Sequence, residues 1–555
     1  MRRDETFGVT GEVAASFKDM AAYLPGLCLA LLATSSVTSG NQPFQFTDDF
    51  SSYPDGSDAY PTWFTTSTPW AVVGGAFISS DRQKSFALVE GAPLGRRQTT
   101  ECTLALRATT DASWKIAGVT VFVDEQNYWH FALVEAPDDA GRTHFVELRE
   151  MYEGSWIAEH AAGTKLTQTV DQNMGLNWSY GHPYRLRLEL TPDTITGSLE
   201  ELDGRVRARC AFKFDNKAVT YGKPGLDSGG FRSEFDNFRT EVTDQVESPT
   251  KTYPVLQLRS WSGVQAVATG FFRTEQINGT WWLIDPQGKG FFVIGTDHAN
   301  YEGQWCEALG YAPYRRNCEQ KYGSIDAWSS STASRLLSWG FNAVAAGHST
   351  SLRYQGLAHL ELLGMGTTFA GAEDICPKTT WTGFPDVFSP NFSRHCERYA
   401  WLRCRPNRDD PWLVGYFIDN ELEWYGKSGR EIGLLEEAVK KDADHPAKKA
   451  LLQLLKEKYS TIQALNAAWG INLASFEDFL LLGHLPSTSK AIEVDGALFL
   501  RQIAERYFSI TASAIRKYDP NHLVLGCRFA GRAQDPAWET AGVYCAVVSV
   551  NCYRM

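Results

Sequence analysis

One carboxylic acid in this sequence occupies a position where chemistry is expected. Glu421 follows the apolar run at residues 412–419, with Asn420 directly before it, in the segment PWLVGYFIDNELEWYGK. The run predicts a buried strand, and in barrels of parallel strands the catalytic groups project from the carboxyl ends of the strands. An Asn-Glu pair alone is weak evidence, because composition predicts about one in a chain of this size. The position at a strand end therefore carries the interpretation that Glu421 takes part in chemistry, with a structural surface Glu as the alternative.

Further polar and aromatic side chains lie at the ends of other apolar runs or in the loops after them. The strand ends of a barrel meet at one rim, so these side chains are expected near Glu421. Groups of these types bind sugar hydroxyls, and aromatic rings stack on the apolar faces of sugar rings. A lone His or Asn at such a position is as often a structural group. The predicted substrate-binding residues are Asn420, Asp297, His298, His348, Trp424, Arg528, Asn551 and Tyr553.

The elements that must position these residues alternate between short apolar runs and helical patterns, which indicates βα units and a parallel sheet. No glycine-rich phosphate turn follows the first run, so a (β/α)₈ TIM barrel fits better than a doubly wound sheet. The segment between the fourth and fifth runs is rich in helix formers and predicts a helical excursion. A barrel needs eight strands, whereas this sequence covers only about six. The six runs are residues 291–297, 341–346, 363–370, 412–419, 523–529 and 545–553.

Residues 41–245 follow a different pattern, of short alternating segments separated by turn residues. In YRLRLEL, Tyr184 and the leucines face one way while Arg185, Arg187 and Glu189 face the other, as in a half-buried antiparallel strand. This predicts an all-β region, most simply a two-sheet sandwich. Its opening segment FTDDFSSYPDG and its closing segment GGFRSEFDNFRTEV resemble the first and last strands of concanavalin-like jelly rolls, in which these two strands pair. Residues 246–279 are predicted to be a linker leading to the barrel, and residues 280–555 the incomplete barrel.

The composition limits the partners. The chain of 555 residues has 65 acidic residues against 53 Lys and Arg, and its net charge is −12. No stretch concentrates basic residues, so nucleic acid and anionic membrane surfaces are excluded as expected partners. Aromatic residues make up 13% of the chain. Large β-rich cores explain part of that share, and a protein that handles polysaccharide or oligosaccharide explains the rest.

Residues 1–40 are predicted to be a leader. From Met20 an apolar run too short for a membrane span ends in small residues, which is typical of a secretory signal, with a buried helix as the alternative. The expected protein is therefore secreted. Removing Cys28 from the 11 cysteines leaves an even number, and Cys306 with Cys318 is a candidate disulfide, with free buried thiols as the alternative. Metal-ligand spacings are absent from the sequence, so neither a metal nor a cofactor is predicted.

Several longer segments resemble one enzyme family. GYFIDNELEW, WWLIDPQGKGFFVIGTD, IRKYDPNHLVLGCRF and VVSVNCY look most like glycoside hydrolase family 50, the β-agarases, within the large clan of retaining glycoside hydrolases built on (β/α)₈ barrels. The resemblance implies hydrolysis of a β-linked, galactose-containing polysaccharide with retention of configuration. It implies that Glu421 is the acid/base and that Asn420 bonds the sugar 2-hydroxyl. It also implies a sandwich domain of carbohydrate-binding type ahead of the barrel.

The family's second catalytic group is a nucleophilic Glu at the end of a seventh strand, which this sequence does not contain. Glu423 belongs to the same loop as Glu421 and would not reach the opposite face of the sugar. Asp297, Glu373 and Asp374 are weaker candidates at strand ends. If the polypeptide stops at Met555, we expect it to lack hydrolytic activity. The alternatives are a catalytically inactive carbohydrate-binding protein and a related β-galactosidase-type hydrolase.

Overall fold

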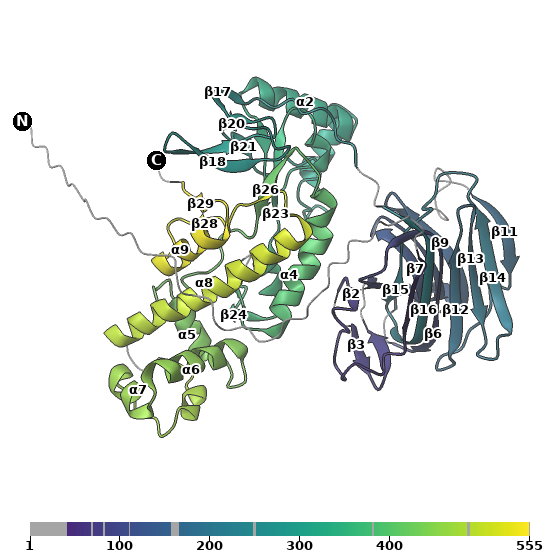
Figure 1. Cartoon of the computed structure of the whole chain (residues 1–555), viewed down its shortest axis with the longest axis horizontal. Coiled ribbons are helices and arrows are strands. Elements are labelled where there is room, and N and C mark those ends of the chain that lie inside the picture. Colours follow the sequence, from purple (N-terminus) through teal and green to yellow (C-terminus); the bar gives the residue numbers. More distant parts are fainter. Residues whose placement is uncertain are drawn as a thin grey trace, which may run out of the picture. The chain divides into compact units, whose positions relative to one another are not determined.

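A computed structural model describes residues 42–67, 70–80, 84–109, 112–156, 166–247, 251–379, 382–485 and 489–553. The predicted leader at residues 1–40 lies outside these ranges. The chain is multidomain and rich in β-structure, with an N-terminal β-sandwich followed by an α/β region (Figure 1). This confirms the expected change of architecture along the chain.

Two antiparallel sheets form the sandwich. One contains, within the described residues, β11 (Thr167–Gln172), β14 (Val206–Lys213), β13 (Thr194–Glu200), β12 (Tyr184–Leu190), β6 (Leu94–Arg107), β16 (Arg232–Val246), β4 (Ala76–Ser79) and β3 (Trp70–Val73), with β1 (Phe44–Asp48) also paired to β16. The other contains β10 (Ser155–Trp156), β9 (His144–Tyr152), β8 (Asn127–Glu135), β7 (Lys115–Asp124), β15 (Lys223–Gly229), β5 (Ser85–Val89) and β2 (Trp63–Thr65).

The sandwich core follows from the alternation in the sequence. In β12 the apolar side chains are buried and the charged ones between them are only partly covered. Trp63, Phe77, Phe131, Leu188 and Phe235 are fully buried in this core. The antiparallel pairing of β1 with β16 confirms that the first and last strands lie side by side.

A small antiparallel sheet follows the sandwich. It consists of β17 (Trp261–Gln265), β20 (Lys289–Phe291), β19 (Thr280–Ile284) and β18 (Arg273–Ile277), in that spatial order. The domain limit expected between residues 279 and 280 therefore falls inside the hairpin of β18 and β19.

The α/β region contains a parallel sheet whose strands follow chain order. They are β21 (Gly295–Thr296), β22 (Ala343–Val344), β23 (Ala358–Leu362), β26 (Leu413–Phe417) and β27 (Leu523–Val524). After β27 the chain forms β28 (Phe529–Ala530), which pairs in parallel with β29 (Val550–Asn551). Each of these strands except β23 falls inside or overlaps one of the predicted apolar runs.

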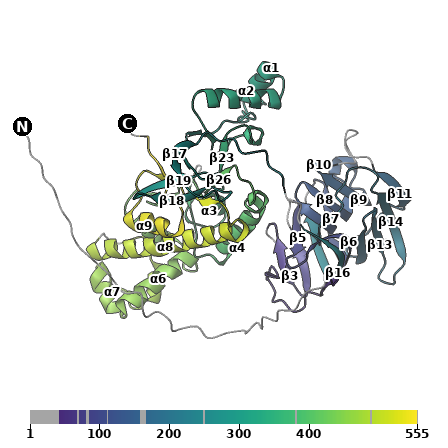
Figure 2. The ribbon, with the colours of Figure 1, turned by 45° about the horizontal axis from the view of Figure 1, so that its top comes forward.

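Helices connect the parallel strands. α8 packs against α4, α5 and α9, and Figures 1 and 2 show it as a long helix. The helices α5 to α8 confirm the predicted excursion between the fourth and fifth strands. The helices of the α/β region are α1 (Pro313–Tyr322), α2 (Ile325–Ser338), α3 (Met365–Phe369), α4 (Pro390–Arg403), α5 (Gly433–Lys440), α6 (Pro446–Tyr459), α7 (Ile462–Trp469), α8 (Lys490–Tyr518) and α9 (Asp535–Tyr544).

The third strand was predicted in the wrong place. Residues 363–370 contain the helix α3, and the strand of the sheet is β23, just before it. The buried carboxylate of Asp419 accepts hydrogen bonds from the backbone N–H groups of Gly366 and Thr367, the second and third residues of α3. These donors have no partner inside a helix, so a carboxylate at this end stabilises the helix. This long-range contact overrides the strand preference of the local sequence.

Candidate active site

The end of β26 is fixed in place by a buried carboxylate. Asp419 is fully buried and accepts hydrogen bonds from Gly366 N at 2.7 Å, Thr367 N at 2.8 Å and the Tyr507 hydroxyl at 2.7 Å. Burial raises the pKa of this carboxyl above its ordinary value. Since these contacts tie β26 to α3 and α8, the next two residues, Asn420 and Glu421, project from a rigid base.

A hydrogen-bonded cluster joins four parts of the chain around Glu421. Asn551 Nδ2, in β29, donates to Glu421 Oε1 at 2.7 Å and to Asn420 Oδ1 at 3.0 Å. Arg528 Nε donates to Asn551 Oδ1 at 3.2 Å, and the Arg528 guanidinium lies 2.8 Å from Asp297 Oδ2. The structure therefore brings together five of the predicted site residues, from positions after β21, after β26, before β28 and in β29.

The backbone at this cluster is strained. His298, Glu421 and Arg528 have φ angles of 57°, 54° and 44°, in the left-handed region that non-glycine residues rarely adopt. Such a conformation costs on the order of 1–3 kcal/mol per residue, and residues that adopt it gather at functional sites. The Glu421 N–H donates to the Arg528 carbonyl at 3.1 Å, so two of the strained residues stabilise each other.

Solvent reaches one side of the cluster. The Asp297 side chain is 32% exposed and the Arg528 side chain 15% exposed, while Glu421 is partly exposed. His298 is exposed and lies against Gly347, where an added Cβ would be 2.7 Å from its Nδ1 atom.

Two predicted substrate-binding residues are corrected by their burial. The His348 side chain is 2% exposed, its Nδ1 donates to the Ala345 carbonyl at 2.7 Å, and its Nε2 accepts from Arg353 Nε at 3.1 Å. Burial lowers the pKa of His348 to about 4, and the ring is a neutral structural group. Trp424 is 3% exposed and stacks on Phe508 in the apolar core, so it offers no ring face to a sugar.

Two aromatic residues, Tyr553 and Trp305, have exposed side chains. Tyr553 is 83% exposed, and its role as a sugar contact stays a prediction. Trp305, on the loop between β21 and α1, is 66% exposed.

Ser549 is a cluster residue that the sequence reasoning missed. Its Oγ accepts from the Arg528 N–H at 3.0 Å and donates to the Leu525 carbonyl at 2.6 Å. Ser549 lies two residues before Asn551, so period-two alternation in the last apolar run could have placed both side chains on one face.

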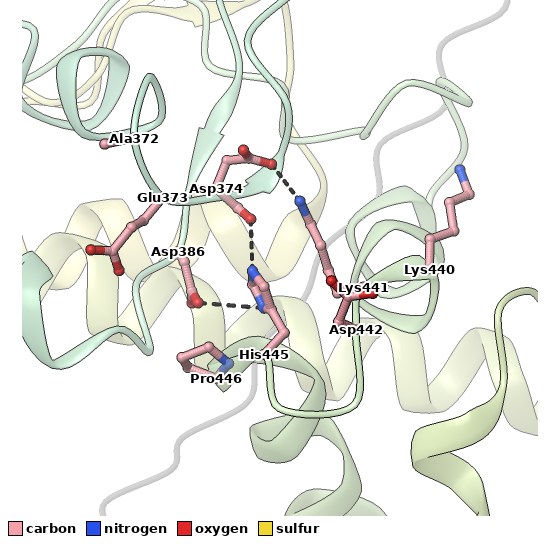
Figure 3. Close-up of a pocket in the computed structure, with 9 residues that line it drawn as sticks. All are labelled: Ala372, Glu373, Asp374, Asp386, Lys440, Lys441, Asp442, His445 and Pro446. Atoms are coloured by element: carbon pink, nitrogen blue, oxygen red, sulfur yellow. Dashed lines mark hydrogen bonds and ion pairs between the residues drawn. The ribbon is translucent and has the colours of Figure 1, made fainter.

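The weaker acid candidates do not contact Glu421. Glu423 Oε1 accepts from Thr382 and Lys427, each at 3.0 Å. Glu373 and Asp374 line a separate polar pocket of about 410 Å³ (Figure 3), where Lys441 contacts Asp374 at 2.5 Å. The residues lining this pocket are Ala372, Glu373, Asp374, Asp386, Lys440, Lys441, Asp442, His445 and Pro446.

The cysteines of the described residues are all unpaired, including Cys306 and Cys318, so the predicted disulfide is wrong and the free-thiol alternative applies. Cys552 is the exposed one among them. No group of three or more His, Cys, Asp or Glu in the described ranges is arranged to hold a metal ion. Among the described helices, none has the length and apolar character needed to cross a membrane.

Comparison with known proteins confirms the resemblance to β-agarases. No family model matches the chain. β-Agarase B of Vibrio sp. strain JT0107 is 28% identical over 355 residues, which cover 52% of this chain and 37% of that protein. β-Agarase A of the same strain is 26% identical over 347 residues, covering 52% and 34%. The chain thus matches about a third of the length of these curated relatives.

Solved structures of agarases are also similar. An exo-β-agarase aligns at 18% identity with a TM-score of 0.46, covering 86% of this chain and 79% of that one. The agarase AgWH50C aligns at 20% identity with a TM-score of 0.45, covering 89% and 81%.

Proposed function

We propose that this chain carries the acid/base carboxyl of a glycoside hydrolase that cleaves β-linked, galactose-containing agar polysaccharide with retention of configuration. The observation that carries the proposal is the cluster of Glu421, Asn420, Asn551, Arg528 and Asp297 at neighbouring strand ends. The similarity to two β-agarases supports the substrate class. Glu421 is the acid/base, and Asn420 holds the sugar next to the bond that breaks.

The chemistry assigned to the site needs two carboxyl groups about 5 Å apart. Glu421, protonated, gives its proton to the glycosidic oxygen as the bond to the anomeric carbon breaks. The second carboxylate attacks that carbon and forms a glycosyl-enzyme ester. Glu421, now ionised, takes a proton from water, which attacks the same carbon and releases the nucleophile. We assign the nucleophile to the seventh strand of the family's barrel, which this sequence does not contain.

The fold proposed for the α/β region is a (β/α)₈ barrel that the sequence covers through about strand six. Five parallel strands in chain order, followed by the β28–β29 pair, support it. In the described part of the chain β21 pairs only with β22, and β29 only with β28. Apolar side chains near these two edges are exposed, among them Phe292 at 75% and Val550 at 40%. Further strands would cover such edges, which otherwise invite pairing.

The domain limits and the location of the protein belong to the same proposal. Residues 41–245 form the carbohydrate-binding-like sandwich, residues 246–279 the linker and barrel entry, and residues 280–555 the hydrolase barrel. The sheet of β17 to β20 extends across residue 279, so the entry continues into the segment assigned to the barrel. Residues 1–40 are the leader of a secreted protein whose partner is a polysaccharide or oligosaccharide. The sandwich is assigned to binding because it precedes the proposed catalytic region as a separate β-unit.

A second candidate function is sugar binding without hydrolysis. It is favoured by the engagement of the other carboxylate in the cluster, because Asp297 is ion-paired with Arg528 and is not free to attack a substrate. In that case the site would bind oligosaccharide and leave it intact.

The test measures reducing ends released from agarose by the natural protein and by two variants. Glu421→Gln is expected to lower the rate by about 10²–10⁴-fold, because the amide cannot transfer a proton. Glu423→Gln is the matched control from the same loop and should stay close to wild type. The anomer formed first, followed by NMR, should have the β configuration. Oligosaccharide binding without any release would favour the second candidate, and loss of activity in Glu423→Gln alone would contradict the assignment of Glu421.

A further inference from the structure

The amide of Asn551 has a defined orientation because its two ends face different partners. Its oxygen lies 3.2 Å from Arg528 Nε, and its nitrogen faces Asn420 Oδ1 and Glu421 Oε1. A guanidinium has donors and no acceptor, so only the amide oxygen can face it. The nitrogen must then donate toward Asn420 and Glu421. Arg528 thus decides which end of the amide faces the acid/base.

Arg528 is itself held on several sides. Its guanidinium bonds to Asp297 Oδ2 at 2.8 Å and lies 5.4 Å from the centre of the Phe417 ring. Its N–H donates to Ser549 Oγ, and its carbonyl accepts from the Glu421 N–H. The side chain is 15% exposed. Arg528 therefore contacts other residues of the protein, whereas the sequence predicted that it contacts the sugar.

We propose that Asp297 and Arg528 are positioning residues that act through Asn551 to orient Asn420 and Glu421 for the substrate. The inference rests on the proposed function. With its oxygen engaged by Asn551, Asn420 presents its Nδ2 donor to a sugar hydroxyl. With Oε1 engaged, Glu421 presents Oε2 to the glycosidic oxygen. Asp297 contributes by orienting Arg528, and neither residue needs to contact the sugar.

The experiment is a double-mutant cycle on binding, which does not depend on turnover. Calorimetry measures the affinity of an agar-derived tetrasaccharide at pH 7 for wild type, Asp297→Ala, Arg528→Met, Asn551→Leu and the double variant Asp297→Ala with Asn551→Leu. Each single change is expected to weaken binding by about 5–20-fold, the effect of one lost hydrogen-bonding partner. In the Asn551→Leu background, Asp297→Ala should add less than about twofold, because residues that act through one another are non-additive.

The orientation of the amide is tested by Asn551→Asp. A carboxylate still accepts from Arg528, but it turns a second acceptor toward Glu421 Oε1 and Asn420 Oδ1. Asn551→Asp should therefore bind the tetrasaccharide more weakly than Asn551→Leu. The reverse ranking would mean that the amide oxygen faces Glu421 and would overturn the inference.

Two controls separate positioning from folding. Arg532→Met breaks an ion pair of equal length, 2.8 Å to Asp535, whose side chains are 77% and 68% exposed, and it should bind like wild type. Thermal unfolding is measured for every variant, and Asp297→Asn replaces Asp297→Ala if the latter does not fold. Additive losses, or an Asp297 variant that binds like wild type, would overturn the positioning role. A wild-type protein that neither binds nor cleaves the sugar would instead overturn the proposed function.

Discussion

At the scale of single residues, the sandwich contains a buried ion pair between Lys115 and Glu135. Lys115 Nζ lies 2.5 Å from Glu135 Oε1, and both side chains are at most 2% exposed. Glu135 Oε2 also bonds to His144 at 2.8 Å and to the Tyr180 hydroxyl. Burial acts to raise the pKa of Glu135, but these hydrogen bonds outweigh it and hold the pKa below its ordinary value. The carboxylate is thus ionised and fully partnered in the folded state.

Lys115→Met is expected to destabilise the protein by about 3 kcal/mol, because it leaves the Glu135 charge buried without its cation. Chemical denaturation followed by circular dichroism measures this change. The matched control is Arg142→Met, which breaks the pair with Asp138, where the side chains are 43% and 55% exposed. That loss of stability should be much smaller, because solvent screens an exposed ion pair. Equal losses of stability in the two variants would show that burial of the Lys115–Glu135 pair does not increase its contribution to stability.

The residues of the site could be predicted from the sequence where their position at the end of a strand brings them together. Asp297, Glu421, Arg528 and Asn551 come together because strand ends meet, and the apolar runs located those ends. The burial of a side chain could not be predicted from the sequence in the same way. Trp424 lies on a loop after a strand, as expected, but α8 supplies Tyr507 and Phe508, which enclose its ring.

At the scale of elements, the close approach of β26 to β27 positions Glu421. A Cβ atom on Gly415 would lie 2.2 Å from the Leu523 carbonyl oxygen, which is a backbone atom and cannot move aside. Leu523 is also the pairing partner of Gly415 in the sheet. Only glycine allows these two strands to pair at this point.

Gly415→Ala is therefore expected to destabilise the protein by about 2–3 kcal/mol, because the two strands must separate to admit the methyl group. It should also weaken oligosaccharide binding by displacing the end of β26. Gly483→Ala is the control, since an added Cβ there meets no atom within 4 Å. Thermal unfolding and calorimetry compare the two variants, and a stable Gly415→Ala protein with normal binding would refute this role.

The assignment of elements from sequence failed where long-range contacts outweigh local preference. β23 has the sequence AHLEL, whose Ala, Leu and Glu favour helix, yet it lies between two parallel strands. α3 contains Thr-Thr-Phe, which favours a strand, but Asp419 stabilises its first turn. Both segments are five residues long, too short for periodicity to decide. The long amphipathic α8 was recognisable because its pattern persists over many turns.

At the scale of the whole molecule, buried histidines make stability depend on pH. Burial lowers the pKa of His348 to about 4 and also lowers the pKa values of His359 and His395. These rings are neutral in the folded protein at a pH where the unfolded chain would bind a proton. Their contribution to the free energy of unfolding is complete above pH 6.5, the ordinary pKa of histidine. It is lost as the pH falls toward the lower pKa of the folded protein.

The protein should therefore unfold at a lower temperature at pH 5 than at pH 7. In His348→Gln the stability lost between pH 6.5 and pH 5 should be smaller by about 2 kcal/mol, the linkage contribution of one such ring. His182→Gln is the control, because the side chain of His182 is 47% exposed. Denaturation curves at both pH values measure the differences. An unchanged pH dependence in His348→Gln would contradict the neutral state of this ring.

The cysteines differ in burial, and this difference makes one of them suitable for attaching a fluorescent label. Burial raises the pKa values of Cys376 and Cys545 to about 12, which keeps these thiols protonated and slow to react. Cys552 is exposed and directly follows Asn551. Among the described cysteines, a thiol-directed fluorophore will therefore attach first at Cys552, where its emission can follow the arrival of a sugar chain.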